Sequence, residues 1–190
     1  MQTEKQLCYT GKGDGGKTST LSGSCVSKCD SVVEANGAVD ELQTSIGVSR
    51  SFLSENSKDI DTILKKVQRD LFAIGAEINS AGKKLEMRKL DESAVRELEN
   101  AIDYIAGNLE RLDRFVISSG PPACTFLHNS RAVCRRVERI VVDFSRENII
   151  NENAVPYLNR LSSLLFVLAR LAAKREGFVE EKWKGNKLMK

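Results

Sequence analysis

The stretch KDIDTILKKVQRDLFAIGAEINS, residues 58–80, decides the fold class of this chain. Its apolar side chains recur three and four residues apart, which is the period of one face of an α-helix. The members of this stripe are Ile60, Ile63, Leu64, Val67, Leu71 and Ile74. The residues between them are mostly polar, so the stretch predicts an amphipathic helix with one side packed against a core.

The same period continues through most of the chain around this helix. It predicts further helices over about residues 31–55, 91–112, 124–147 and 155–175. Asp91 and Ser93 are candidate N-caps of the third helix in this order. No stretch has the bounded, β-branched run that is typical of a parallel strand. Five helices with short connections predict an all-α bundle.

The two ends of the chain differ in composition from this helical region. Residues 1–29 are rich in Gly, Ser, Thr and Lys, and they predict a loop that is ordered by itself or by a ligand. Residues 30–176 then form the helical bundle domain. Residues 177–190 are polar and predict a mobile tail.

Composition indicates an ordinary globular protein, with 41% hydrophobic and 29% charged residues. A net charge of +3 is too small to argue for nucleic-acid binding by itself. The amino terminus has no apolar signal region, and the longest apolar run, LLFVLA at 164–169, is too short to span a bilayer. Five cysteines without the spacing of a disulfide framework favour a reducing compartment. We therefore predict a cytoplasmic protein with no membrane partner.

The segment GKGDGGKT, residues 11–18, matches the phosphate-binding pattern G-x-x-x-x-G-K-[ST]. A P-loop needs a buried strand before this pattern and a helix that begins at its Lys-Thr pair. The preceding TEKQLCY is too polar for such a strand, and the following STLSGSCVSK is a poor helix former. The context argues against a P-loop fold, but the glycine backbone and the nearby lysines and hydroxyls remain suited to phosphate. A flexible surface loop is the alternative.

A second informative stretch is SRAVCRRVERIVVDF, residues 130–144. At about 100° per residue its apolar positions form one stripe, and a set of charged residues lies opposite. This charged face comprises Arg131, Arg135, Glu138 and Arg139, with Arg136 at its edge. Arginines one turn apart repel one another, and guanidinium groups suit phosphate or carboxylate. The face therefore predicts an anion site, in which Glu138 holds a guanidinium or helps to ligate a metal carried by a polyphosphate. A solvated helix face is the alternative.

The last predicted helix places Asn159, Ser162 and Ser163 opposite its leucine stripe. A ligand contact and an ordinary surface position are both open for Asn159. His128 is the only histidine, which excludes a ferritin-like metal bundle and favours a structural role for this residue. Cys25 and Cys29 have no second pair to complete a zinc site, so we predict no metal site built by the protein itself.

Four stretches in this order, YTGKGDGGKTSTLSG, SKCD…NGAVDEL…IG, SRAVCRRVER and YLNRLSSLLF, resemble the ATP:cob(I)alamin adenosyltransferases of the propanediol-utilisation type. The resemblance covers about residues 9–170. It implies a five-helix bundle that assembles as a homotrimer and holds ATP between neighbouring subunits. The glycine-rich loop would then hold the phosphates of ATP on a helical fold.

The resemblance also implies which residues form this shared site. One subunit would supply Thr10, Gly11, Lys12, Gly13, Thr18, Ser19 and Lys28. Its neighbour would supply Arg135, Arg136, Glu138, Arg139 and Asn159. Asp40 would pair across the interface with Arg131, and Phe115 would lie under the corrin ring and push away the lower axial ligand. The family's usual residues are replaced at three positions, where this chain has Ser118, Ser119 and Ser163.

The implied reaction joins the cobalt of cob(I)alamin to C5′ of ATP and releases triphosphate. Because the cobalt is the nucleophile, the chain needs no Ser-His-Asp or Cys-His set. Its tasks would be to orient the substrates and to neutralise the leaving triphosphate together with Mg²⁺. A reductase and a B12-dependent acceptor enzyme would be partners. The alternative is a helical binding module whose arginine face takes nucleic acid or an acidic partner, with affinity that falls steeply as salt rises.

Overall fold

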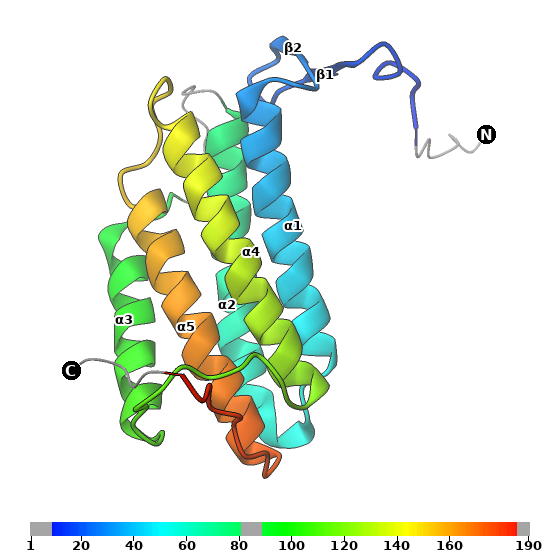
Figure 1. Ribbon diagram of the computed structural model, residues 1–190. Helices are drawn as coiled ribbons and strands as arrows, with labels where there is room; N and C mark the ends of the chain where they lie inside the picture. Colours follow the sequence, from blue (N-terminus) through cyan, green and yellow to red (C-terminus); the bar gives the residue numbers. More distant parts are fainter. Residues whose placement is uncertain (1–8, 81–88, 186–190) are drawn as a thin grey trace, which may run out of the picture.

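Five α-helices lie side by side along most of the chain (Figure 1). The computed structural model describes residues 9–80 and 89–185. The helices are α1 (Ser31–Ser51), α2 (Lys58–Asn79), α3 (Glu92–Gly107), α4 (Pro122–Phe144) and α5 (Ala154–Arg175). One 3₁₀ turn, η1 (Glu55–Ser57), leads from α1 into α2. The prediction of an all-α bundle with five helices is confirmed.

The apolar stripes of the helices form one core. In α2, the side chains of Ile60, Leu64 and Leu71 are fully buried. In α5, four leucines that recur at helical spacing have no exposed surface: Leu161, Leu164, Leu165 and Leu168. Helix α5 packs against α4 and α3, and α1 packs against α4 and α2. Each buried leucine contributes about 2 kcal/mol of hydrophobic stabilisation, so the stripes account for the packing of the helices.

A small antiparallel hairpin lies at the end of the bundle where α1 begins (Figure 1). Its strands are β1 (Lys17–Ser19) and β2 (Cys25–Ser27), and Gly23 in the turn has a φ of +81°. The backbone N–H of Leu21 donates to Oδ1 of Asn79 at 3.1 Å, which ties the turn to the end of α2. The sequence predicted a loop here because the strands have three residues each and their pattern is polar.

Helix α3 begins as predicted and ends earlier than predicted. Asp91 is its N-cap, with a carboxylate that accepts from the N–H of Ala94 at 3.2 Å, whereas Ser93 lies inside the helix. The helix ends at Gly107 instead of residue 112. Beyond this end, side chains of α5 bind the backbone: Lys174 donates to the carbonyl of Asn108 at 2.8 Å, and Arg170 to that of Glu110 at 2.9 Å. These contacts stabilise a non-helical path.

The segment after α5 folds back onto the bundle. Gly177 has a φ of +68°, its N–H bonds to the carbonyl of Lys174, and the N–H of Phe178 bonds to that of Ala173. This pair of bonds is the Schellman arrangement, in which glycine reverses the chain at the end of a helix. Phe178 then packs against the core. The prediction of a mobile tail is therefore wrong for these residues, and residues 186–190 lie outside the described part of the chain.

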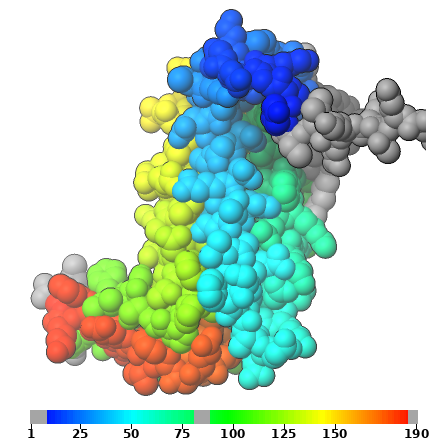
Figure 2. All heavy atoms as spheres, turned by 90° about the vertical axis from the view of Figure 1, so that its right-hand side faces the viewer, coloured from blue at the N-terminus to red at the C-terminus, as the bar shows by residue number. Residues whose placement is uncertain are grey.

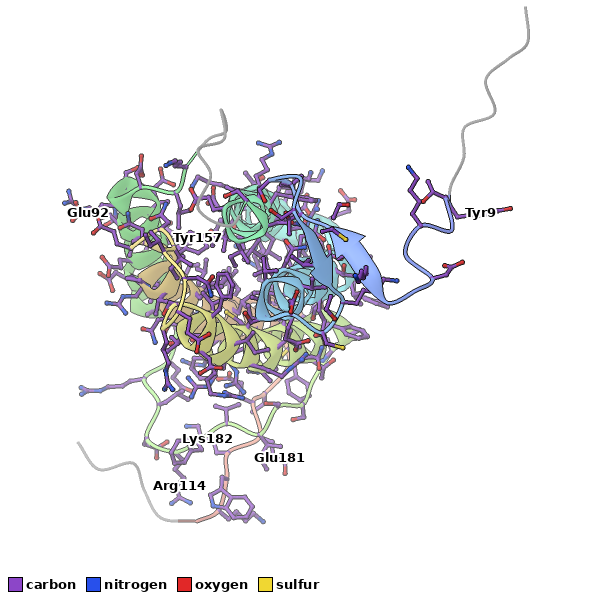
Figure 3. The ribbon with its side chains drawn as sticks, turned by 90° about the horizontal axis from the view of Figure 1, so that it is seen from above. Tyr9, Glu92, Arg114, Tyr157, Glu181 and Lys182 are labelled. Atoms are coloured by element: carbon purple, nitrogen blue, oxygen red, sulfur yellow. The ribbon has the colours of Figure 1, made fainter. Side chains whose placement is uncertain are left out.

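One carboxylate is buried among the helices. Asp70 of α2 is 1% exposed, and its Oδ2 accepts from the hydroxyl of Tyr157 of α5 at 3.0 Å and from Lys66 Nζ at 3.2 Å. Tyr157 itself is fully buried and lies among the helices when the bundle is seen from above (Figure 3). The hydrogen bond thus joins α2 to α5 inside the core.

Replacing Tyr157 with phenylalanine removes this hydrogen bond and keeps the ring. We expect Tyr157→Phe to lower the free energy of unfolding by about 1–2 kcal/mol, because a buried carboxylate loses one donor. Urea unfolding followed by circular dichroism measures the change. Tyr104→Phe is the matched control, since Tyr104 of α3 is 77% exposed; equal stability of the two variants would contradict the assignment.

The cysteines that the structure describes are all free thiols. Cys25 and Cys29 are exposed, and Cys124 and Cys134 are buried. Burial raises the pKa of the Cys124 thiol to about 11, so this group stays protonated at neutral pH. Within the described ranges, no helix is both long and apolar enough to cross a membrane.

Candidate functional site

The glycine-rich loop before the hairpin has a defined backbone. Gly11 and Gly16 have φ values of +70° and +78°, a region that favours glycine. The N–H of Gly16 donates to the carbonyl of Gly13 at 3.2 Å, and the N–H of Lys28 donates to that of Gly16 at 2.9 Å. Lys17 and Thr18 lie in β1 rather than at the start of a helix. The loop is therefore not a P-loop.

This loop brings the amine of Lys28 close to the glycine backbone. A Cβ added at Gly13 would lie 3.1 Å from Nζ of Lys28. Because glycine has no side chain, the ammonium group lies directly beside the Gly13 backbone. Thr10, Gly11, Lys12 and Ser19 are exposed, and Gly13 and Thr18 are half-buried. Open glycine backbone beside an ammonium group and hydroxyls is a suitable surface for phosphate oxygens.

The glycine-rich loop extends beyond the outline of the helices. Seen from above, Tyr9 at its start lies far outside the bundle, and the loop leads outward from the hairpin (Figure 3). Tyr9 is 81% exposed. The loop is therefore placed where it can reach a second molecule, not where it could cover a site on its own helices.

The charged residues of α4 lie on its outward side, as predicted. Arg135, Arg136 and Arg139 are exposed, whereas Arg131 and Glu138 are half-buried. Arg136 forms an ion pair with Glu41 of α1. Arg131, Arg135 and Arg139 form no ion pair with any carboxylate in residues 9–80 or 89–185. Three guanidinium groups on one helix therefore have no counter-charge from the part of the chain that the structure describes.

Arg131 is the least satisfied of these three. Its Nε is buried and has no hydrogen-bond partner within the described chain. Burial and the positive charge of Arg135 lower the pKa of the Arg131 guanidinium. A half-buried cation in this condition is stabilised by an anion from outside the chain, because it has lost part of its hydration without gaining a partner.

Glu138 and Asn159, predicted on separate helices, contact each other. Nδ2 of Asn159 donates to Oε1 of Glu138 at 2.9 Å. Arg160 then donates to Oδ1 of Asn159 at 2.6 Å and to Oε1 of Glu99 of α3 at 2.8 Å. Within the described residues no guanidinium pairs with Glu138, so the prediction that Glu138 holds a guanidinium is not met inside one chain, and its alternative, a contact to a metal carried by a polyphosphate, stays a prediction. Ser162 is also not outward-facing: it is 6% exposed and donates to the carbonyl of Asn159.

Asp40 lies on a different side of α1 from α4. It lines a groove of about 270 Å³ between α1 and α2, together with Gln43 and the exposed ring of Phe72. Figure 2 shows α1 facing the viewer with α4 on one side and α2 on the other. Asp40 forms no ion pair with a cation of the described residues, Arg131 included. The two predicted partners therefore do not meet within one chain.

Phe115 lies in the loop between α3 and α4, at the opposite end of the bundle from the hairpin (Figure 1). Its side chain is 64% exposed.

His128 of α4 is 3% exposed, and its ring packs beside that of Phe166 at a centroid distance of 5.9 Å. Burial, and secondarily the charge of Arg131, lowers the pKa of this imidazole, which favours its neutral form. These contacts fit the structural role predicted for His128.

The described residues contain no set of side chains that could bind a metal ion without other ligands. Within residues 9–80 and 89–185, no group of three His, Cys, Asp or Glu side chains could hold a metal ion. Glu138 has one carboxylate oxygen bonded to Asn159, and it lies on the arginine face. A metal ion that arrives with its own phosphate ligands needs only one or two protein oxygens.

The sequence did not identify several partners of these residues. Glu41 pairs with Arg136, and Arg160 with Glu99. Each pair joins two helices that are distant in the sequence. Their pairing depends on how neighbouring helices are aligned, and only the acidic and basic character of each residue was visible beforehand.

Comparisons with known proteins show which family this chain resembles in sequence and fold. A family model described as Cobalamin adenosyltransferase matches residues 8–172. The corrinoid adenosyltransferase MMAB of Bos taurus is 37% identical over 185 residues, which is 95% of this chain and 77% of that protein. The corrinoid adenosyltransferase of Bacillus subtilis (strain 168) is 33% identical over 171 residues, 89% of this chain and 88% of that protein.

A solved structure also resembles the bundle closely. It is a variant PduO-type ATP:corrinoid adenosyltransferase from Lactobacillus reuteri, complexed with cobalamin and ATP. The TM-score is 0.89 at 27% sequence identity, and the match covers 96% of this chain and 98% of that one. Both the sequence and the fold thus match the same group of proteins.

Proposed function

This chain belongs to the cobalamin adenosyltransferase family, and from that premise we propose that its glycine-rich loop and its arginine face form one ATP site between neighbouring subunits of a homotrimer. The protein is a transferase. It moves the 5′-deoxyadenosyl group of ATP to the cobalt of cob(I)alamin, which forms adenosylcobalamin and releases triphosphate.

The bond changes define what the residues must do. The cobalt(I) electron pair forms a bond to C5′ of the ribose, and the bond between C5′ and its triphosphate oxygen breaks. The leaving triphosphate takes that electron pair and carries several negative charges. The protein therefore needs to align C5′ with the cobalt and to stabilise the triphosphate as its charge develops.

In this proposal the glycine-rich loop of one subunit holds the triphosphate. The backbone N–H groups of Gly11 and Gly13, the ammonium groups of Lys12 and Lys28, and the hydroxyls of the loop donate to phosphate oxygens. The hydroxyls are those of Thr10, Thr18 and Ser19. The closeness of Lys28 Nζ to the Gly13 backbone supports this role, since one phosphate group could contact both.

The arginine face of the neighbouring subunit completes the site. Arg135 and Arg139, which form no ion pair with a described carboxylate, bind the triphosphate, and Arg136 contributes from the edge of the face. The contact between Glu138 and Asn159 holds both side chains in place beside it. Arg131 pairs with Asp40 of the adjoining subunit, which gives each of them an ionic partner that the described part of its own chain does not supply.

Mg²⁺, if it accompanies the triphosphate, would neutralise charge on the leaving group. Glu138 is the carboxylate of the arginine face that could contribute a ligand to it. The guanidinium groups would hold the phosphates in place beside this carboxylate.

Phe115 serves the corrin side of the reaction. Its exposed ring lies under the corrin and displaces the lower axial ligand, which makes cobalt(II) easier to reduce. The reductase and the B12-dependent enzyme that receives the product are part of this proposal, as is the cytoplasmic location expected from the sequence.

The observation that carries the shared ATP site has two parts: no carboxylate of residues 9–80 or 89–185 pairs with Arg131, Arg135 or Arg139, and a phosphate-suited loop lies outside its own bundle. A nucleic-acid-binding module would also use the arginines, but it would give no role to the glycine-rich loop. Its binding would weaken steeply as salt rises and would not require ATP.

The test is direct. Protein, Mg-ATP and chemically reduced hydroxocobalamin are mixed without oxygen, and we expect the absorption spectrum of adenosylcobalamin to develop. AMP in place of ATP is the control, because it lacks the triphosphate leaving group. Absence of any ATP-dependent change in the spectrum would overturn the proposal.

A further inference from the structure

The loop that carries Phe115 is held by the segment that follows α5. We call residues 108–121 the Phe115 loop and residues 178–185 the C-terminal strap. The N–H of Ile117 donates to the carbonyl of Glu181 at 2.8 Å, and the N–H of Trp183 donates to the carbonyl of Phe115 at 2.8 Å. Val116 and Lys182 form the antiparallel bridge between these two bonds. The loop and the strap run beside each other at one side of the bundle (Figures 1 and 3).

These backbone bonds fix Phe115, because its side chain has little packing of its own. The ring is 64% exposed. Its position therefore follows from the path of the backbone, which is bonded to the strap on both sides of Val116. An additional ion pair, between Lys182 and Asp113 at 3.2 Å, also joins the strap to the loop.

The strap is in turn anchored by one ion pair. Nε of Arg170 lies 2.9 and 3.0 Å from the two carboxylate oxygens of Glu180, and Nη2 lies 2.9 Å from Oε2. The Arg170 and Glu180 side chains are 8% and 18% exposed. Nη2 of Arg170 also donates to the carbonyl of Glu110 in the Phe115 loop at 2.9 Å. A single guanidinium from α5 thus binds both segments.

A close contact fits the loop to the strap at a second point. Gly120 of the Phe115 loop has a φ of +127°, and a Cβ at this position would lie 3.1 Å from the ring of Phe178. Only glycine allows both this backbone conformation and this approach. The strap therefore matches the loop in shape as well as in hydrogen bonding.

We propose that Glu180 is a positioning residue for the corrin side of the reaction, acting through Arg170 and the strap backbone to hold Phe115 in place. It touches no substrate. The inference rests on the proposed function of Phe115, and it adds that the ion pair of Glu180 controls how well that ring displaces the lower axial ligand.

The test compares Glu180→Ala with Glu181→Ala. The two positions are adjacent and both substitutions remove one negative charge, but the Glu181 side chain is exposed and only its carbonyl binds the loop. Trp183 is the only tryptophan, so its fluorescence reports on the strap. In protein without substrates, we expect acrylamide to quench this fluorescence more strongly in Glu180→Ala than in Glu181→Ala or the parent.

The kinetic comparison uses both oxidation states of cobalamin. We expect Glu180→Ala to react roughly 10-fold more slowly than the parent from cob(II)alamin with a fixed reductant, with a KM for ATP that is unchanged, because a displaced ring aligns poorly with the corrin. From pre-reduced cob(I)alamin, the loss should be less than about 2-fold. Electron paramagnetic resonance of bound cob(II)alamin should show more of the nitrogen-ligated form in Glu180→Ala.

The outcomes separate this inference from the proposed function. If the parent makes no adenosylcobalamin, the proposed function fails. If the parent is active but Glu180→Ala and Glu181→Ala lose equal activity from both cobalt states, the inference is wrong. Should Glu180→Ala prove unstable, a second variant is Trp183→Pro, which removes the N–H bonded to Phe115 and leaves the ion pair intact. This variant must show the same selective loss of activity from cob(II)alamin. If Trp183→Pro reacts at the rate of the parent, the inference is overturned.

Discussion

Arg135→Ala should lose roughly 100-fold or more in the rate of adenosyl transfer, because a charged donor to the leaving triphosphate is removed. The helical circular dichroism and the thermal midpoint should stay near those of the parent. The reason is that the guanidinium is exposed and forms no ion pair with a described carboxylate. Loss of its repulsion with Arg131 and Arg139 even favours the helix slightly.

The matched control for this variant is Arg146→Ala. Arg146 follows α4 and forms an exposed pair with Asp143, with side chains 75% and 79% exposed. Its removal takes away the same charge without touching the arginine face. Rates for Arg135→Ala within a factor of about two of this control would show that Arg135 does not act on ATP.

A mixing experiment tests whether the site is shared between subunits. Lys12→Ala alters the glycine-rich loop, and Arg135→Ala alters the arginine face. After the two inactive proteins exchange subunits at equal amounts, about a quarter of the interfaces in a closed ring combine an intact loop with an intact face. Activity should therefore return to about that fraction. No recovery after demonstrated exchange would place both parts of the site in one chain.

Phe115→Ala should act mainly on cobalt reduction. For a one-electron couple, a change of about 59 mV in the reduction potential of cobalt(II) changes the ratio of cobalt(I) to cobalt(II) about 10-fold. If the ring raises this potential by about 120 mV, Phe115→Ala should lose roughly 100-fold in the rate of adenosyl transfer from cob(II)alamin. From pre-reduced cob(I)alamin the loss should be less than about 3-fold. The fold should survive, since the ring is 64% exposed and the carbonyl that binds Trp183 is retained.

Tyr104→Ala is the control for removing an exposed aromatic ring. Tyr104 lies on α3 and is 77% exposed. Both variants are assayed from both cobalt states with the same reductant. Equal losses of Phe115→Ala from the two states would separate this residue from displacement of the lower axial ligand and would leave it a role in binding alone.

The bundle itself could be predicted from the sequence because each helix is specified by the pattern of residues within its own segment. The stripe of α2 and the leucines of α5 recur at the helical period, and that period is visible in the order of residues. Helix ends were less accurate: α1 ends at Ser51 and α4 at Phe144, each a few residues short of its prediction. Phe52 and Leu53 follow α1 and extend its apolar pattern past the end of the helix, whereas polar residues follow α4. Neither pattern carries a signal that places the last turn.

The parts that were missed depend on distant contacts. The three-residue strands of the hairpin form only because they pair with each other, and the strap is held by Arg170 and the core. Gly177 followed by Phe178 was the available signal, since glycine after a periodic stretch predicts a chain reversal. That signal predicts a turn but not the loop to which the following residues bind.

The candidate site follows the same division. Residue type and spacing on α4 identified the arginine face, and the glycine pattern identified the loop. The pairing of Glu138 with Asn159 was not predicted, because two helices must be aligned before their side chains can be matched. The separation of Asp40 from Arg131 within one chain likewise depends on where each helix face points.

The outward position of the glycine-rich loop has a consequence for how the enzyme is handled. On the proposal of a shared site, the glycine-rich loop and the arginine face of an isolated subunit do not form an ATP site with each other. The specific activity of a stock solution should therefore fall as it is diluted toward the subunit dissociation constant. Saturating ATP should delay that loss, since a nucleotide held by two subunits opposes their separation.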